Sequence, residues 1–529
     1  MKKIIYILVL FIGVSILSNS CVKDLDLTPV DPDEVTSATV FENPESYTQF
    51  LAKCYAGLAV GGQQGGDGQA DISGIDGGFS QYLRQYWYHQ ELTTDEAVIG
   101  WDDATIKDFH WHQWGDGDTF IAAMYYRIYY QISLCNEYLR QTTDDLLDDR
   151  GVTDDWREKI TYYRAEIRFL RALSYWHVLD MFGNGVPFVV ETDPIGDFFP
   201  PAISKDNLFS YIESELKSIE NSLYPAPHPE YGRADQAAAQ MVLAKLYLNA
   251  EVYIGQNRYS DCITYCDKII SGPYSLAPTF QQLFWANNDQ DVNTMKEIIF
   301  PIRYDGAQTQ TWGGTTFIIA ASIGGSMTAQ DYGTAERWGG TRTTKEFVSM
   351  FSGDDSRAMF YTDGQNLEIE DIGTFEEGYA VTKFRNVYYE NGVAISGSNE
   401  THMDTDFPMF RLADVYLMYA EAVVRGGGGN AGQALDYMNA LRNRVDATPI
   451  SGSDLTLDFI IDERARELYW ECHRRTDLIR FNKLTGGNYI WTWKGNIKEG
   501  RSTDAKYNLF PLPAQDVNAN PNISQNPNY

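Results

Sequence analysis

Residues 407–445 read FPMFRLADVYLMYAEAVVRGGGGNAGQALDYMNALRNRV and contain two segments whose apolar residues recur every three or four positions. That spacing places these residues on one face of a helix. They are Leu412, Tyr416, Tyr419 and Val423 in the first segment, and Ala434, Met438, Leu441 and Val445 in the second. The glycine run 426–429 breaks the helix between them, and two helices joined by so short a loop pack antiparallel. The pattern predicts a helical hairpin of the tetratricopeptide type.

Residues 457–481 read LDFIIDERARELYWECHRRTDLIRF and add a third amphipathic segment with many charged side chains. Its apolar stripe consists of Ile461, Ala465, Leu468 and Cys472. Acids and bases three or four residues apart can pair along a helix. Two interpretations remain open: a solvated charged face with a few structural ion pairs, which we favour, or a catalytic Glu–Arg cluster. The neighbouring Tyr469, Trp470 and Phe481 indicate that part of the network is covered.

The end of this segment, ERARELYWECHRRTDLIRF at 463–481, closely resembles the signature of the SusD/RagB family of glycan-binding outer-membrane lipoproteins. Two other segments resemble family motifs, RAEIRFLRALSYWHVLDMFGNGVPFV at 164–189 and NLFPLPAQDVNANPNISQNPNY at 508–529. The chain departs from the family pattern at Cys472, Arg475 and Asn528. The positions that match in the first segment are Glu463, Arg464, Glu467, Leu468, Glu471, His473, Arg474, Asp477 and Leu478.

The resemblance implies an all-α fold of about four tetratricopeptide-like helical hairpins, which form a right-handed scaffold with long irregular loops and minor β structure. Residues 21–529 are then a single SusD-like domain with a loop-rich insertion at about 272–407. Short β-type runs at 297–300 and 379–384 predict strands inside this insertion. Apolar periodicity predicts further helices at 41–58, 120–139, 156–182, 207–223, 234–253 and 259–270.

Residues 1–21 read MKKIIYILVLFIGVSILSNSC and have the layout of an export signal: two lysines, an apolar run and small residues before Cys21. The apolar run is shorter than the roughly 20 residues that span a bilayer. Because the cysteine after small residues resembles a bacterial lipobox, we expect residues 1–20 to be a lipoprotein signal peptide and Cys21 to be lipidated. A secreted protein with an ordinary Cys21 is the alternative. The family resemblance implies an outer-membrane lipoprotein that is exposed on the cell surface.

The charge balance excludes some partners. The formal net charge is −31, and it becomes 40 − 73 = −33 once Lys2 and Lys3 leave with the leader. Such a chain repels nucleic acid and anionic lipid, so neutral glycans fit it better than anionic ones. The 35 Tyr and 12 Trp residues suit a surface that stacks on flat ligand faces. The remaining cysteines have no metal-binding spacing, and we expect them to be buried small hydrophobic residues.

Two regions carry candidate ligand-binding residues. Trp101, Asp102 and Asp103 follow a segment that matches the family pattern before a binding loop. An indole can cover the apolar face of a sugar, and carboxylates accept hydrogen bonds from its hydroxyl groups. The alternative is that Trp101 caps the core and that the two aspartates cap a helix. In the insertion, aromatic and basic residues lie beside glycines, where loops often carry function: Trp312, Tyr332, Arg337 and Trp338.

The family resemblance implies a cell-surface protein that captures oligosaccharides and delivers them to a partner SusC-like TonB-dependent transporter. A peptide-binding import lipoprotein of the same architecture is the main alternative. A glycoside hydrolase is less favoured, because the chain has no GxSxG, HExxH or phosphate-loop pattern and its many acids make some carboxylate pair inevitable. The sequence therefore predicts a binding protein without catalytic residues, cofactor or metal.

Overall fold

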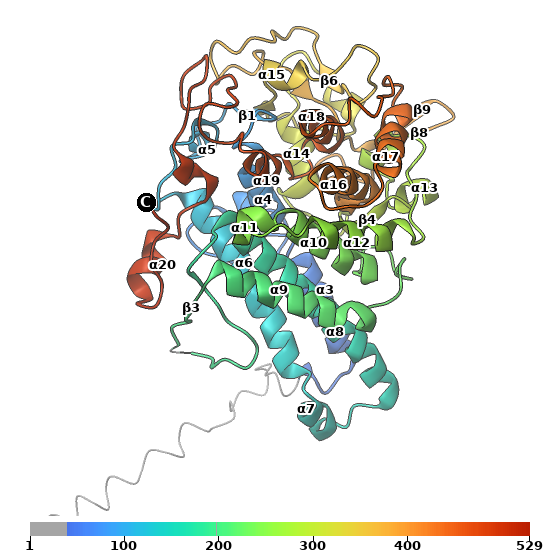
Figure 1. Cartoon of the computed structure of the whole chain (residues 1–529). Coiled ribbons are helices and arrows are strands. Elements are labelled where there is room, and N and C mark those ends of the chain that lie inside the picture. Colours follow the sequence, from blue (N-terminus) through green and yellow to red (C-terminus); the bar gives the residue numbers. More distant parts are fainter. Residues whose placement is uncertain (1–39, 197) are drawn as a thin grey trace, which may run out of the picture.

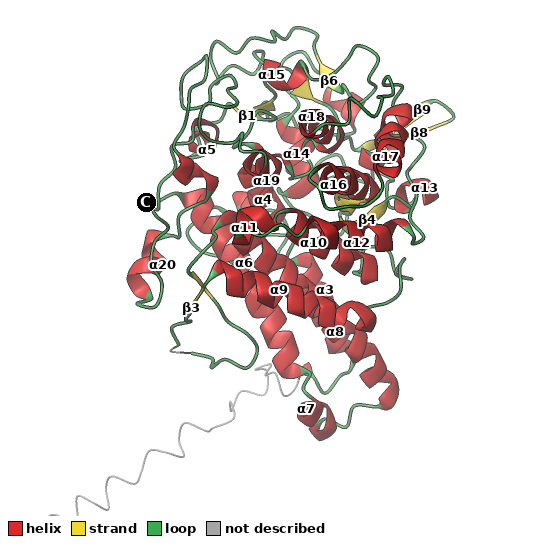
Figure 2. Cartoon of the chain, viewed as in Figure 1, coloured by secondary structure: helices red, strands yellow, loops and turns green. Residues whose placement is uncertain are grey.

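The computed structural model describes residues 40–196 and 198–529, so the predicted signal peptide and Cys21 lie outside the described residues. Helices dominate the fold, and long loops connect them at one end of the molecule (Figure 2). The first helical group contains α3 (Glu45–Ala56), α4 (Tyr82–Glu91), α5 (Lys107–Trp111), α6 (Thr119–Gln141), α7 (Asp144–Asp149), α8 (Asp154–Met181), α9 (Lys205–Ile219), α10 (Gln236–Leu248), α11 (Ala250–Ile254) and α12 (Tyr259–Ile270). The second contains α16 (Leu412–Val424), α17 (Ala431–Arg444), α18 (Leu457–Leu468), α19 (Arg474–Arg480) and α20 (Ala514–Ala519).

The long helices pack in a continuous series (Figure 1). Helix α6 packs against α8, α8 against α9, α10 against α12, α12 against α16, and α16 against α17. The α16–α17 hairpin confirms the prediction from the opening stretch, and the rings of Tyr416 and Tyr437 stack across it with centroids 4.3 Å apart. Helix α16 begins at Leu412, because residues 407–411 form a strand instead. The tetratricopeptide-like helical fold is therefore confirmed.

The insertion is less irregular than its composition indicates. It contains the short helices α13 (Val292–Met295), α14 (Gly314–Ala321) and α15 (Lys345–Val348). Its strands are β4 (Ile298–Ile302), β5 (Thr341–Arg342), β6 (Phe360–Tyr361), β7 (Ala380–Val381), β8 (Val387–Glu390) and β9 (Val393–Ser396), and the strands outside it are β1 (Val98–Ile99), β2 (Val186–Pro187), β3 (Ala202–Ile203) and β10 (Phe407–Arg411). Each strand pairs with a single partner, all antiparallel, and β10 pairs with β4 while β1 pairs with β5.

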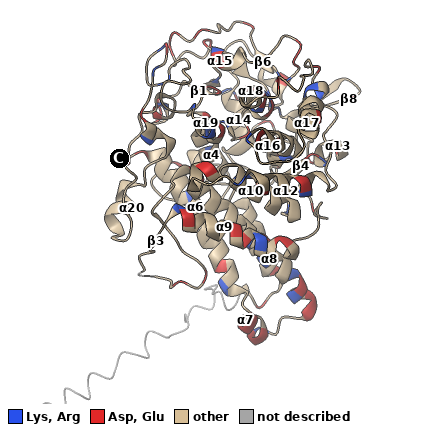
Figure 3. Ribbon diagram, in the orientation of Figure 1, with Lys and Arg blue, Asp and Glu red and all other residues tan. Residues whose placement is uncertain are grey.

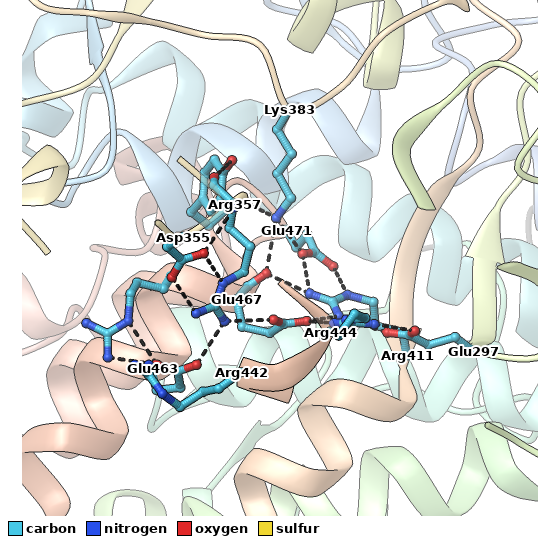
Figure 4. A network of polar contacts seen from close by, with 12 residues as sticks. Glu297, Asp355, Arg357, Lys383, Arg411, Arg442, Arg444, Glu463, Glu467 and Glu471 are labelled. Atoms are coloured by element: carbon cyan, nitrogen blue, oxygen red, sulfur yellow. Dashed lines mark hydrogen bonds and ion pairs between the residues drawn. The ribbon is translucent and has the colours of Figure 1, made fainter. Parts of the chain in front are cut away.

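The charged helix α18 lies in the core, so the expectation of a solvated charged face is wrong. The side chains of Glu463, Glu467 and Glu471 are at most 1% exposed, and Figure 4 shows them between arginines from several segments. Arg411 at the start of α16 contacts Glu467 and Glu471, both at 2.6 Å. The arginines hold the pKa of Glu467 well below its usual range, although burial opposes them. Full burial leaves no path for a substrate, which also excludes the catalytic interpretation.

The same network fastens the insertion to the helical scaffold (Figure 4). Arg357 of the insertion contacts Glu463 and Glu467, both at 2.9 Å. Lys383, also in the insertion, donates to Glu471 at 2.6 Å. Because these ion pairs are buried, breaking one leaves an unpaired charge in the interior and is strongly destabilising. The insertion loops are therefore held in one position on the helices.

Candidate functional site

Three tryptophans from distant parts of the chain meet at one surface. The ring centroids of Trp101 and Trp338 lie 6.2 Å apart, and those of Trp312 and Trp338 lie 5.9 Å apart. All three side chains are half-buried, so each indole keeps part of its surface open to solvent. We call Trp101, Trp312 and Trp338 the tryptophan platform.

Strand pairing positions two members of the platform. Strand β1 pairs with β5 so that Val98 faces Arg342, and the N–H of Gly100 donates to the carbonyl of Gly340 at 2.9 Å. Trp101 follows β1 and Trp338 precedes β5, so the pairing brings the two indoles together. A Cβ atom added to Gly340 would lie 2.4 Å from the Trp101 ring. Only glycine fits at position 340 while Trp101 keeps its place.

Helix α14 positions Trp312 relative to Trp338. Trp312 lies just before the helix, and the N–H of Trp338 donates to the carbonyl of Ala320 near its end at 3.0 Å. The Trp312 indole N–H donates to Asp67 at 2.7 Å, and its ring lies 4.7 Å from that of His402. The loop around Asp67 therefore forms one border of the platform.

The indole N–H groups of the platform already have partners within the protein. Trp101 donates to the carbonyl of Trp338 at 3.3 Å, and Trp338 donates to the carboxylate of Glu336 at 2.8 Å. Since these donors are engaged, the faces and edges of the rings are what remains for a ligand. Such surfaces suit apolar faces of a partly polar molecule.

A buried guanidinium supports the platform from below. Arg84 of α4 is 4% exposed, and its central carbon lies 5.9 Å from the Trp101 ring and 5.7 Å from the Trp338 ring. It donates to the carbonyl of Trp312 at 2.8 Å. Its closest ring contacts are Phe79 at 4.3 Å and Phe317 at 4.7 Å. The sequence analysis missed Arg84, whose only signal is a cation inside the aromatic segment YLRQYWY at 82–88.

The remaining predicted site residues lie in different surroundings. Asp102 and Asp103 are exposed, and Asp102 pairs with Lys107. Neither aspartate caps α5, because Ile106 occupies the N-cap position and no side chain bonds there. Both follow Trp101 directly in the chain, and Asp103 has no ion pair among the described residues.

Arg337 and Tyr332 differ in exposure. Arg337 is exposed, adjoins Trp338 in sequence and donates to the carbonyl of Gly325 at 2.6 Å. Tyr332 is only 8% exposed, and its ring lies 5.2 Å from the Arg385 guanidinium. Arg337 therefore lies near the platform, because it adjoins Trp338 in the chain. Tyr332 does not reach the platform surface. Tyr332 is part of the packing instead.

The platform is a surface and not a deep pocket. The three tryptophans line neither of two cavities found among the described residues, one of about 660 Å³ beside α3 and β4 and one of about 370 Å³ beside α3 and α6. Within residues 40–196 and 198–529, no three His, Cys, Asp or Glu side chains are grouped to hold a metal ion. The five cysteines in this part of the chain are unpaired and buried, as predicted. None of the described helices is both long and apolar enough to span a bilayer.

Fold and site together define a tetratricopeptide-like helical scaffold that displays an aromatic surface on loops. The chain belongs to the SusD family: it is 34% identical to the starch-binding protein SusD of Bacteroides thetaiotaomicron, in an alignment covering 96% of each chain. Residues 360–529 match the sequence model of the SusD family. A SusD-like protein of Formosa agariphila, P2, is 25% identical, with 87% of this chain and 92% of that protein covered. The resemblance described from the sequence is confirmed.

Solved structures share the fold. A SusD superfamily protein from Parabacteroides distasonis superposes with a TM-score of 0.69 at 21% identity, covering 94% of this chain and 100% of that one. Surface glycan-binding protein A from Bacteroides thetaiotaomicron, in complex with laminarihexaose, superposes with a TM-score of 0.64 at 21% identity, covering 91% and 99%. The relatives with a named role are binding proteins. The prediction of a binding protein and not an enzyme is therefore confirmed.

Proposed function

We propose that this protein captures oligosaccharides at the cell surface on the tryptophan platform and delivers them to a SusC-like TonB-dependent transporter. The observation that carries the proposal is the convergence of Trp101, Trp312 and Trp338, which come from three separate segments, on one solvent-facing surface. The starch-binding role of the 34% identical relative supports a carbohydrate ligand.

The chemistry of the platform matches a sugar chain. Pyranose rings have apolar C–H faces that pack on indole, while their hydroxyl groups need donors and acceptors at the rim. Asp102 and Asp103 are exposed acceptors beside Trp101, and Arg337 supplies donors beside Trp338. We expect modest affinity, on the order of micromolar to millimolar. Such affinity suits a protein that must also release its ligand.

The cellular setting rests on the sequence. The leader and Cys21 support a lipid anchor on the outer membrane, and the resemblance to the SusD/RagB family supports the transporter as the receiving partner. The anchor keeps the platform close to the membrane in which such a transporter resides.

Titration of Trp101→Ala with defined oligosaccharides tests the function. Maltoheptaose, laminarihexaose and a mixture of short peptides serve as probes in isothermal titration calorimetry. We expect the wild-type protein to bind an oligosaccharide and Trp101→Ala to bind it at least about fivefold more weakly, since stacking on one aromatic side chain contributes about 1–3 kcal/mol in proteins that stack nucleic-acid bases. Binding of peptides alone would favour the peptide-import alternative.

Trp156→Ala is the matched control. Trp156 is also a half-buried tryptophan, but it lies at the start of α8, and a lysine side chain stands 4.3 Å from its ring. This end of α8 adjoins α7, far from the insertion (Figure 1). We expect Trp156→Ala to retain wild-type affinity. Equal affinities of wild type and Trp101→Ala, with equal thermal midpoints, would remove the platform as the site.

A further inference from the structure

A chamber with both polar and apolar walls lies next to the loop that borders the tryptophan platform. It has a volume of about 370 Å³, within the range of small-molecule sites. Helix α3 supplies Lys53 to its wall and α6 supplies Tyr130, while the glycine-rich loop 60–71 covers it. Gln308 and Gln310 complete the lining. The walls thus offer an aromatic ring, amides and charges of both signs.

The charges in and behind the chamber are incompletely satisfied. The carboxylate of Asp71 lies 4.0 Å from the Lys53 ammonium and 3.9 Å from the Nη1 atom of Arg127, too far for a hydrogen bond in either case. The Arg127 side chain is fully buried, and its Nη1 atom has no hydrogen-bond partner. A buried donor without a partner is unfavourable, but Arg127 does not line the chamber, so Lys53 and Asp71 are the charged groups that a ligand can reach.

Two chain segments contribute both to the chamber and to the surroundings of the platform. Loop 60–71 lines the chamber with Gly62, Gln63 and Asp71, and the same loop bonds to the Trp312 indole through Asp67. Gln308 and Gln310 line the chamber and lie just before Trp312 in the sequence. The chamber therefore adjoins the platform at its Trp312 end, where loop 60–71 lies between the two.

The geometry points to a second binding compartment that takes the next sugar unit of an oligosaccharide held on the tryptophan platform, an inference that rests on the proposed function. A hydroxyl group placed between Lys53 and Asp71 accepts from the ammonium and donates to the carboxylate, which closes a gap too long for a direct bond. The Tyr130 ring offers a face for stacking. Since the local charges include both signs, the chamber suits a neutral polyol and not an anion.

The test compares short and long oligomers. Full-length mature protein carrying Asp71→Asn or Lys53→Gln is titrated with maltotriose and maltoheptaose, and with laminaritriose and laminarihexaose. A trisaccharide is short enough to lie on the three indoles alone, whereas the longer chains reach the chamber. We expect each variant to lose about tenfold in affinity for the longer oligomer, as for a hydrogen bond to a charged group, and to bind the trisaccharide like wild type.

Asp148→Asn is the control for Asp71→Asn, because it makes the same change at an exposed carboxylate on acidic helix α7 (Figure 3).

Unchanged affinity of both chamber variants for the longer oligomer would overturn the second compartment, and so would an equal loss for both chain lengths. If Trp101→Ala loses affinity for the longer oligomer while Asp71→Asn keeps it, the second compartment is overturned and the proposed function stands. A wild-type protein that binds none of the probes overturns both proposals. If Asp71→Asn lowers the thermal midpoint, the affinities of Lys53→Gln for the short and long oligomers test the second compartment on their own.

Discussion

At the scale of single residues, Gly340 shows how a backbone position controls a distant side chain. Its hydrogen-bonded partner Gly100 precedes Trp101, and no space remains between Gly340 and the Trp101 ring. Arg84 acts from the opposite side by holding the carbonyl of Trp312 while contacting the rings of Trp101 and Trp338. Buried groups therefore support the platform from two sides, Gly340 against the Trp101 ring and Arg84 beneath it.

We expect Gly340→Ala to weaken oligosaccharide binding about as much as Trp101→Ala does, although it removes no ligand-contacting atom. The added methyl carbon would stand 2.4 Å from the Trp101 ring, so the indole must move. Calorimetric titration measures the affinity, and tryptophan fluorescence reports the displacement. Gly353→Ala is the control, since a Cβ atom there meets nothing within 4 Å. Wild-type affinity in Gly340→Ala would show that the placement of Trp101 is unimportant.

At the scale of elements, the segment from the end of α4 to β1, which leads to Trp101, is hydrogen-bonded to the loop that follows helix α18. The N–H of Cys472 donates to Glu91 at 2.6 Å, and the N–H of Trp470 donates to Glu96 at 3.2 Å. Both carboxyl groups are at most 1% exposed, and the second oxygen of Glu91 has no donor. Burial raises the pKa of Glu91 to about 7, and burial together with the charge of Glu91 raises the pKa of Glu96. Burial therefore favours the protonated form of both carboxyl groups.

This carboxyl pair gives the stability a defined pH dependence. An unfolded glutamate has a pKa of about 4.3, so the unfolded chain releases its proton first as the pH rises. The contribution of Glu91 to the free energy of unfolding is full below about pH 4.3 and is lost as the pH rises through about 7. We expect the wild-type protein to lose about 2–3 kcal/mol from this group between pH 5 and pH 8.

Glu91→Gln removes this titration but keeps an acceptor for Cys472 and gains a donor for Glu96. Its free energy of unfolding, measured by urea denaturation at several pH values, should fall less steeply than that of wild type. Asp148→Asn, at an exposed position, should keep the wild-type slope. If the free energy of unfolding fell with pH equally steeply in Glu91→Gln and wild type, Glu91 would not contribute this pH dependence.

Much of the helical architecture was predictable because it is encoded locally. The expected helix at 259–270 coincides with α12, and the one expected at 156–182 is close to α8. Helix α14 was missed, because its buried run TFIIAA has no apolar period. Strands β1 and β5 are two residues long and carry no recognisable pattern, although they set the geometry of the platform.

Burial and convergence were harder to predict than helices. Alternating acids and bases look the same in sequence whether they face solvent or a partner element, so the buried state of α18 was not visible. Trp101, Trp312 and Trp338 were expected individually from their neighbours, but their meeting depends on long-range pairing. Tyr332 has the same glycine-loop context and nevertheless packs inward. Local sequence context thus identifies candidates, and the tertiary fold decides which of them reach the surface.

At the scale of the whole molecule, the proposed anchor determines where the platform can work. We expect Cys21→Ser to abolish lipidation and to release the protein from the membrane fraction, because the acyl chains on Cys21 are the proposed anchor. Labelling with a radioactive fatty acid and fractionation of a lipid-modifying bacterial host measure both effects. The purified variant should bind oligosaccharide like wild type. Retention of Cys21→Ser in the membrane fraction would contradict lipid anchoring at this residue.

The spread of the platform along the chain has a further consequence. Its members span residues 101–338, and the ion pairs that secure the insertion extend to Glu471. No fragment released by a single proteolytic cut within that span, and no nascent chain that ends before Glu471, contains the whole arrangement. Sugar binding should therefore appear only after synthesis has passed this residue and the chain has folded, which makes retention on a carbohydrate resin a direct assay for uncut, correctly folded protein.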